Sequence, residues 1–362
     1  MIKYYTRACN FYYGSFSKKL VKNKKALPLN GNNQISFDQV EIFSKNKKKV
    51  SSRVFNTKNI KSLPKFIRNK VNRDLKKITS KKKIFNQKSH IIMGILNMTP
   101  DSFSDGGKYN KTKKSFKRIK QMIKEGADII DVGGESTRPG SQIVNSIIEW
   151  KRIKNVVTKF KKKFPKTILS VDTRKSSVML NSLKYKANIA NDVSCFKYDE
   201  NFFDIIKNKD LWKVIHHMQG TPQTMQINPK YNHVLLDIYD FFEYELIKFK
   251  KDKYRKKIIL DPGIGFGKNL KHNLMILSKI SIFHSLGFPI LVGSSRKRFI
   301  NQISKKFDSK ERIGGTLSSV IYLLSQGVKI FRVHEVGEVK QGILVFEKLL
   351  NEWKKIFWDW RN

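Results

Sequence analysis

The chain has 362 residues, of which 40% are hydrophobic, and its formal net charge is +45. No apolar run reaches the roughly 18 residues that a membrane helix needs, so we expect no membrane partner. The first ten residues contain charges and tyrosines but no apolar signal core, which predicts a cytoplasmic protein. Because the first 90 residues are basic and poor in acids, organelle targeting is the alternative location.

The charge and the cysteines narrow the class of protein further. Residues 1–90 contain 24 Lys and Arg but three Asp and Glu, and Asn and Ile accompany the lysines throughout the chain. This bias, without any nucleic-acid-binding motif, indicates a solvated basic surface and no nucleic-acid partner. Cys9 and Cys195 have no paired spacing, which predicts a reducing compartment and no disulfide.

In chain order, residues 1–88 come first and have an irregular pattern. A strand over 26–29, a turn at 30–33 and a second strand over 35–43 predict a small β-hairpin, and 64–78 predicts a short helix. We expect residues 44–88 to be an exposed segment and assign no chemistry to the basic extension 1–88. Deletion of residues 1–85 should leave the chemistry, if not the solubility, intact.

From His90 onward, short β-rich runs alternate with longer helical stretches, which is typical of a parallel sheet with crossover helices. The eight expected strands are 91–96, 128–132, 167–171, 189–191, 213–217, 257–260, 289–292 and 330–333. The expected helices are 113–124, 146–160, 176–186, 231–251, 269–284, 311–326 and 336–353. The pattern predicts an α/β protein in which residues 89–362 form a (β/α)₈ TIM barrel.

Polar clusters follow almost every expected strand, and in a barrel these strand ends meet on one catalytic face. Asp172 and Asp261 follow apolar strands and could bind an amidine-like edge of a heterocycle through paired hydrogen bonds. The cations suit a phosphorylated ligand; they are Arg138, Lys297, Arg332 and His334. The sequence therefore predicts a site for a polar heterocycle that carries phosphate.

Two other kinds of site are disfavoured. The glycines at 263, 265 and 267 follow the sixth strand as G-x-G-x-G, whereas a dinucleotide site needs G-x-G-x-x-G in the first βαβ unit. His216 and His217 are adjacent on a strand, so they point to opposite faces and do not suggest a zinc site.

The polar segments resemble those of dihydropteroate synthases, in the same order along the chain. Two long motifs, 93–107 (MGILNMTPDSFSDGG) and 131–140 (DVGGESTRPG), make the resemblance specific, and it covers about residues 90–350. Shorter matches lie at 170–173, 191–192, 217–220, 261–268, 295–297 and 332–334. The resemblance implies a folate-pathway transferase that joins 6-hydroxymethyl-7,8-dihydropterin diphosphate to 4-aminobenzoate and releases diphosphate.

The resemblance also implies roles for individual residues. The pterin ring would be held by Asp172, Asn191, Asp261 and Lys297, with Met218 lining the pocket. Asn97, Arg332 and His334 would hold the diphosphate, Asn97 together with Mg²⁺. The 4-aminobenzoate pocket would be built by Thr137, Arg138, Pro139 and Phe266, and the loop 101–107 would close over the site. The catalytic set would then be Asn97, Asp172, Asp261 and Lys297, and the family is commonly homodimeric.

The chain departs from the family's pattern at one position, and two other functions are alternatives to that of a synthase. Arg298 stands where many family members have a serine that contacts the carboxylate of 4-aminobenzoate. A methyltetrahydrofolate-binding methyltransferase domain shares the barrel and the pterin pocket but needs no diphosphate site. A basic nucleic-acid-binding protein on a degenerate barrel predicts an incomplete site and steeply salt-dependent binding.

Overall fold

The computed structural model describes residues 2–47, 49–82, 84–85, 89–99, 108–137, 140–305 and 308–359. Eight parallel strands form a ring in the order β10-β9-β8-β7-β6-β5-β12-β11, which confirms the predicted barrel. They are β5 (Ile91–Asn97), β6 (Ile129–Gly133), β7 (Ile168–Asp172), β8 (Ile189–Asp192), β9 (Trp212–His216), β10 (Ile258–Asp261), β11 (Leu291–Val292) and β12 (Ile330–Val333). A parallel bridge between Leu260 and Ile290 joins the two ends of this order.

Helices follow the strands and cover the outside of the barrel. They are α3 (Lys108–Lys124), α4 (Ser146–Lys163), α5 (Ser176–Lys184), α6 (Phe202–Ile206), α7 (Val234–Lys248), α8 (Leu270–Ser278), α9 (Arg298–Ser304), α10 (Ile313–Ser325) and α11 (Val336–Asp359), with 3₁₀ turns η3 (Ile280–Leu286) and η4 (Ser309–Glu311). The expected helix over 269–284 is divided at Lys279, where φ is −121°. Among the described residues, no helix combines the length and apolar character that crossing a bilayer requires.

The barrel interior is built in layers. Its apolar layer takes side chains from nearly every strand, including Ile129, Ile189, Ile259 and Ile330. Because side chains alternate along a strand, the residue two positions further on points into the same interior. Those next residues are polar: Asp131, Asn191, Asp261 and Arg332. The apolar layer thus forms the floor of a polar mouth at the carboxyl ends of the strands.

The N-terminal part is an ordered sheet with helices rather than an irregular segment. Its strands β1 (Lys3–Tyr13), β2 (Leu27–Leu29), β3 (Asn32–Asn46) and β4 (Lys49–Asn56) pair antiparallel, with β3 between its partners. Its helices are α1 (Gly14–Lys22), η1 (Thr57–Ser62) and α2 (Lys65–Thr79). We call residues 2–82 the extension. The expected strands at 26–29 and 35–43 and the helix at 64–78 match β2, β3 and α2, whereas β1, β4 and α1 were not expected.

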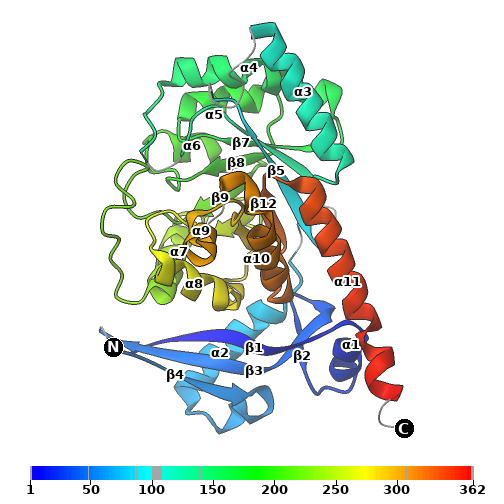
Figure 1. Ribbon diagram of the computed structural model, residues 1–362. Helices are drawn as coiled ribbons and strands as arrows, with labels where there is room; N and C mark the ends of the chain where they lie inside the picture. The colour runs from blue at the N-terminus through cyan, green and yellow to red at the C-terminus, as the bar shows by residue number, and fades with distance from the viewer. Residues whose placement is uncertain are drawn as a thin grey trace.

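The extension packs tightly on the barrel, and the segment 44–88, which was expected to be exposed, is partly buried, at Ile60, Val71 and Ile78 among others. Figure 1 shows it as a layer beside α7, α8 and α10, at the end of the molecule opposite α3, α4 and α5. Tyr5 and Phe43 are buried in the same apolar cluster as the barrel helices. The ring of Tyr5 meets that of Tyr239 on α7 edge-on, with 5.1 Å between centroids. Tyr5 of β1 thus packs on the barrel, whereas Ala8 of the same strand packs in a separate apolar cluster of the extension, which explains why its sequence lacks the usual alternation.

Candidate active site

Arg332 is the centre of the polar mouth. Its Nε donates to Asp131 Oδ2 at 2.7 Å, and its Nη2 donates to Asp172 Oδ2 at 2.7 Å. Asn191 Nδ2 lies 3.1 Å from Asp131 Oδ2. Strands β6, β7, β8 and β12 thus bring one cation, two carboxylates and an amide into direct contact, although the residues are up to 201 positions apart.

A second group joins this site from β9, β10 and the segment after β11. Lys297 Nζ lies 4.1 Å from the ring centroid of Phe266, which is a cation–π distance. The ring of His216 meets Phe266 edge-on at 4.7 Å between centroids. Met218 packs on the small cluster that contains Phe266. His216 Nε2 lies 4.0 Å from Asp261 Oδ2, so these aromatic and charged groups line one side of the mouth.

Burial changes the acidity of the groups in the mouth. It raises the pKa of Asp172 to about 7, against the opposing charge of Arg332. It raises the pKa of Asp261 to about 6, although the Gly263 N–H donates to this carboxylate. Burial and the nearby Arg332 charge lower the pKa of Lys297 to about 8. Such displaced pKa values in a concave site are typical of catalytic and binding groups.

The glycine-rich segment 263–268 is held in place by a buried lysine. Lys268 Nζ donates to the carbonyls of Gly263 at 2.9 Å and Phe266 at 2.8 Å and lies 2.9 Å from His217 Nδ1. Gly263 has φ of +65°, and a Cβ there would lie 1.9 Å from the His217 carbonyl oxygen. This segment therefore packs directly on the end of β9, which fixes the position of Phe266.

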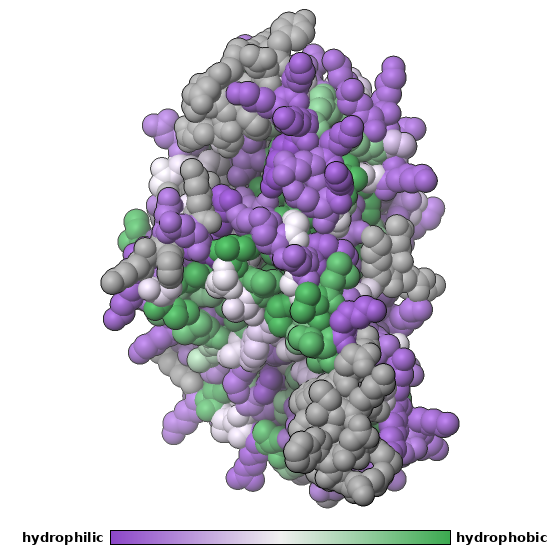
Figure 2. Space-filling model, turned by 45° about the vertical axis from the view of Figure 1, so that its right-hand side comes forward, coloured by the Kyte–Doolittle hydropathy of each residue, from purple (hydrophilic) through white to green (hydrophobic). Residues whose placement is uncertain are grey.

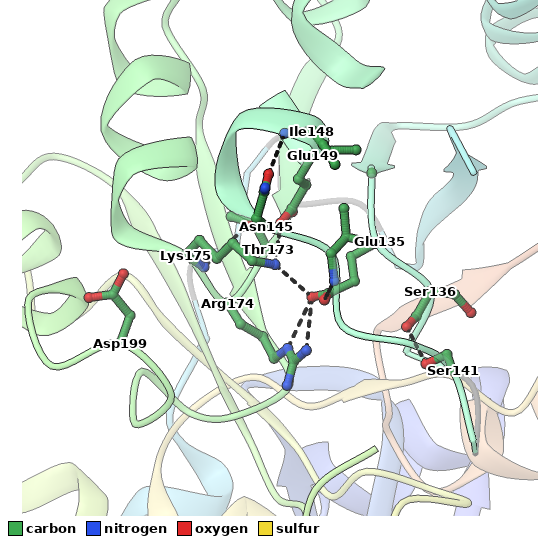
Figure 3. A network of polar contacts seen from close by, with 12 residues as sticks. Glu135, Ser136, Ser141, Asn145, Ile148, Glu149, Thr173, Arg174, Lys175 and Asp199 are labelled. Carbon is green, nitrogen blue, oxygen red and sulfur yellow. Dashed lines mark hydrogen bonds and ion pairs between the residues drawn. The ribbon is translucent and has the colours of Figure 1, made fainter. Parts of the chain in front are cut away.

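A buried ion network supports the segment after β6 (Figure 3). Glu135 accepts hydrogen bonds from Arg174 Nε at 3.1 Å and from the Val144 N–H at 2.9 Å. Lys175 Nζ lies 3.0 Å from Glu135 and 2.7 Å from Glu149. Thr137 lies between Glu135 and Val144. Glu135 binds the backbone of Val144 and the side chains of Arg174 and Lys175 before α5, so both ends of this segment are held next to the start of α5.

The remaining predicted residues are placed as follows. Asn97 is the last residue of β5 and pairs with Gly133 of β6 at the same rim. Ser295 Oγ lies 2.9 Å from His334 Nδ1, which orients the imidazole after β12. Thr137 lies in the segment that Glu135 anchors, and it is half-buried. Arg138, Pro139 and the loop 101–107 lie outside the described residues.

The sequence reasoning missed four residues that build this site. Asp131 is the most important, since it is completely buried and binds both Arg332 and Asn191. The sequence contains an indication of this role, because Asp131 stands two positions after Ile129 in an otherwise apolar strand. Glu135, Arg174 and Lys268 act through other residues, and their roles depend on contacts that a single sequence does not reveal.

A barrel with one charged mouth at the carboxyl ends of its strands defines an enzyme of the (β/α)₈ class. Residues 93–334 match the family model described as pterin binding enzyme. Over 261 residues the chain is 41% identical to the dihydropteroate synthase of Escherichia coli K12, which covers 72% of this chain and 92% of that protein.

Solved structures agree with this match. The dihydropteroate synthase of Yersinia pestis, solved with a sulfonamide drug complex, has 36% identity and a TM-score of 0.66. That of Xanthomonas albilineans, solved with 4-aminobenzoic acid, has 30% identity and also a TM-score of 0.66. Each similarity covers 72% of this chain and 93% of the other. The chain belongs to the dihydropteroate synthase family of pterin-binding enzymes and is therefore a transferase.

Proposed function

We propose that this chain condenses 6-hydroxymethyl-7,8-dihydropterin diphosphate with 4-aminobenzoate to give 7,8-dihydropteroate and diphosphate. The observation that carries the proposal is the contact of Arg332 with both Asp131 and Asp172 inside the barrel mouth. Acidic groups and cations meet there within one small volume. A ligand with a hydrogen-bond-donating heterocycle and an anionic tail suits this pairing.

For the pterin end we propose the buried polar groups of the inner strands. The carboxylates of Asp172 and Asp261 would accept hydrogen bonds from the ring, and Asn191 and Lys297 would complete the contact. Met218 would line the pocket. Asp131 would orient both Arg332 and Asn191, because its carboxylate binds each of them.

For the diphosphate end we propose Asn97, Arg332 and His334. Within the described ranges, no group of three or more His, Cys, Asp or Glu side chains is arranged to hold a metal ion. Mg²⁺, however, is commonly bound through one or two protein oxygens together with substrate phosphates. The amide oxygen of Asn97 at the rim fits that pattern, so Asn97 would hold Mg²⁺ with the diphosphate. The ion would then neutralise charge on the leaving group.

For the 4-aminobenzoate end we propose Thr137, Arg138, Pro139 and the ring of Phe266. The structure of the Xanthomonas albilineans relative contains 4-aminobenzoic acid, which supports this substrate. Arg298 is exposed at the first position of α9 and would add positive charge near the substrate carboxylate.

The proposed chemistry is a dissociative substitution. The bond between the pterin methylene carbon and the diphosphate oxygen breaks, and the bonding electrons leave with diphosphate. The arylamine nitrogen then forms the new bond to the methylene carbon and loses one proton to solvent. Fixed carboxylates stabilise the positive charge that develops on the pterin, and Arg332 stabilises the departing anion. Preorganised groups of this kind contribute about 2.7–4 kcal/mol each.

The direct test is a diphosphate-release assay on the full chain. Pterin diphosphate and 4-aminobenzoate together should give rapid diphosphate release. Without 4-aminobenzoate the pterin cation and the bound diphosphate should recombine, so that little diphosphate is released. A methyltetrahydrofolate-binding domain would release none under either condition. That result would refute the proposed reaction.

We also propose a cytoplasmic homodimer. A groove between α8, α9 and α10 is lined by exposed apolar side chains that include Leu274, Met275, Ile303 and Tyr322. Figure 2 shows hydrophobic residues gathered in the middle of one face among mainly hydrophilic ones. A second copy covering the groove would remove this apolar surface from water. The buried, free thiols of Cys9 and Cys195 fit a reducing compartment.

A further inference from the structure

We propose that the extension is a positioning element of the active site, in which Lys45 fixes the start of α7 and thereby holds the segment 263–268. The extension lies outside the residues that match the family model, so nothing in that match assigns it a role. The consequence for catalysis rests on the function proposed above, whereas the structural link can be tested without substrate.

The first link joins the extension to α7. Lys45, near the end of β3, donates from Nζ to Asp237 Oδ1 at 2.8 Å and to Asp240 Oδ2 at 3.0 Å. The Lys45 side chain is 17% exposed and that of Asp237 is 23% exposed, so this pair is more shielded from solvent than a typical surface pair. The ring of Phe43, two residues earlier, meets that of His233 at 6.2 Å between centroids.

The second link joins Asp237 to the segment that precedes α7. Asp237 Oδ2 accepts the backbone N–H groups of Asn232 at 2.8 Å and His233 at 3.0 Å. His233 is the N-cap residue of α7. Asp237 therefore binds Lys45 with one oxygen and the entry of the helix with the other, so loss of Lys45 would free this carboxylate to move.

The third link joins the entry of α7 to the glycine-rich segment. Tyr231, directly before Asn232, donates its hydroxyl to the carbonyl of Gly267 at 2.7 Å. Gly267 has φ of +62°, and a Cβ there would lie 2.5 Å from the Gln219 carbonyl oxygen. The segment is thus pressed between Tyr231 on one side and Gln219 on the other.

The last link reaches the site itself. Gly267 follows Phe266, whose ring contacts both Lys297 and His216. Displacement of the Gly267 carbonyl would therefore shift the ring that packs against 4-aminobenzoate under the proposed function. Each step is a direct contact, which is the physical basis for expecting coupling between the extension and the site.

The test compares two lysines of the extension that bind the same helix. Lys45→Met removes the link, and Lys45→Arg should restore it. Lys3→Met is the matched control, because Lys3 Nζ binds Asp240 and Glu243, each at 2.6 Å, but does not contact Asp237 within the described residues. Tyr231→Phe removes only the hydroxyl that binds Gly267.

Hydrogen exchange of the full-length variants provides the substrate-free measurement. We expect amides in 230–233 and 263–268 to exchange about tenfold faster in Lys45→Met and to stay unchanged in Lys3→Met. Equal exchange of 263–268 in the two variants would overturn the proposal. If the two lysines only stabilised the fold, amide exchange would be faster throughout α7 in both Lys45→Met and Lys3→Met.

Steady-state kinetics test whether the link from Lys45 to Gly267 affects the binding of 4-aminobenzoate. We expect Lys45→Met and Tyr231→Phe each to raise KM for 4-aminobenzoate about fivefold, with a smaller change in kcat, and the double variant to match the worse single variant. Additive effects would show two independent roles and contradict the proposal. A wild-type chain that releases no diphosphate would instead refute the proposed function, and the exchange comparison would still decide the positioning role.

Discussion

The strands of the barrel and those of the extension differ in how completely they are buried. Barrel strands such as β6 are buried along their whole length, because helices cover one face and the interior layers fill the other. In the extension, β4 is mostly exposed and β3 is buried only in part. The extension has a small apolar cluster of its own, which includes Phe37 and Val71, and it also shares Tyr5 and Phe43 with the barrel's core. A region without proposed catalytic residues is therefore an integral part of the folded chain.

Deletion of residues 1–85 should have the largest effect, because the extension and the barrel share buried side chains. It uncovers Tyr239 and removes Ile84, which closes the apolar layer of the barrel interior. Truncating one buried aromatic side chain costs about 3–5 kcal/mol, so the loss of several such groups should exceed the whole stability of a typical domain. We expect the truncated chain to be insoluble or molten by circular dichroism, in contrast to the expectation from sequence. A soluble, cooperatively folding and active truncation would show that the barrel stands alone.

Asp172→Asn tests the barrel side of the comparison. The change removes a charge from the contact with Arg332 and should lower kcat/KM about 10²- to 10³-fold, as for loss of one preorganised catalytic group. Thermal unfolding of the variant serves as the control for folding. Near-normal turnover would remove this aspartate from the mechanism.

Glu135→Gln should act mainly on stability. Arg174 would keep its buried charge without its carboxylate partner, which typically costs about 3 kcal/mol or more, whereas Lys175 would still be paired with Glu149. The matched control is Asp204→Asn, which removes the exposed ion pair with Lys207 and should change the free energy of unfolding by less than about 0.5 kcal/mol. Equal destabilisation in denaturant titrations of the two variants would contradict the role of Glu135.

The pH dependence of kcat/KM should show the smallest effect. As pH falls through about 7 and then about 6, Asp172 and Asp261 gain protons and cease to accept hydrogen bonds from the pterin. As pH rises through about 8, Lys297 loses its charge. A bell-shaped profile is therefore expected, and Lys297→Arg should move the alkaline limb upward, since a guanidinium stays protonated. If the alkaline limb of Lys297→Arg lay at the same pH as that of the wild-type chain, the limb would report the titration of a group other than Lys297.

The two regions also differ in how far the sequence predicts them. The barrel strands and the charged residues of the proposed site follow from local pattern, because residues such as Asp172 and Asp261 stand at the ends of apolar runs. The roles proposed for Asn97, Asn191 and Phe266 came instead from the family resemblance. In the extension, β1 carries apolar side chains on both faces, so its sequence has no period of two. The partners of Glu135 and Lys45 come from distant parts of the chain and become visible only when the chain is folded.

The most direct measurement is the ratio of 7,8-dihydropteroate formed to diphosphate released by the purified full-length chain. Mass spectrometry would quantify the pteroate, and a coupled assay would quantify the diphosphate. The proposed reaction gives equal amounts of the two products, and both should fall together when 4-aminobenzoate is withheld. Diphosphate released at an undiminished rate without 4-aminobenzoate, with water as the acceptor, would contradict it.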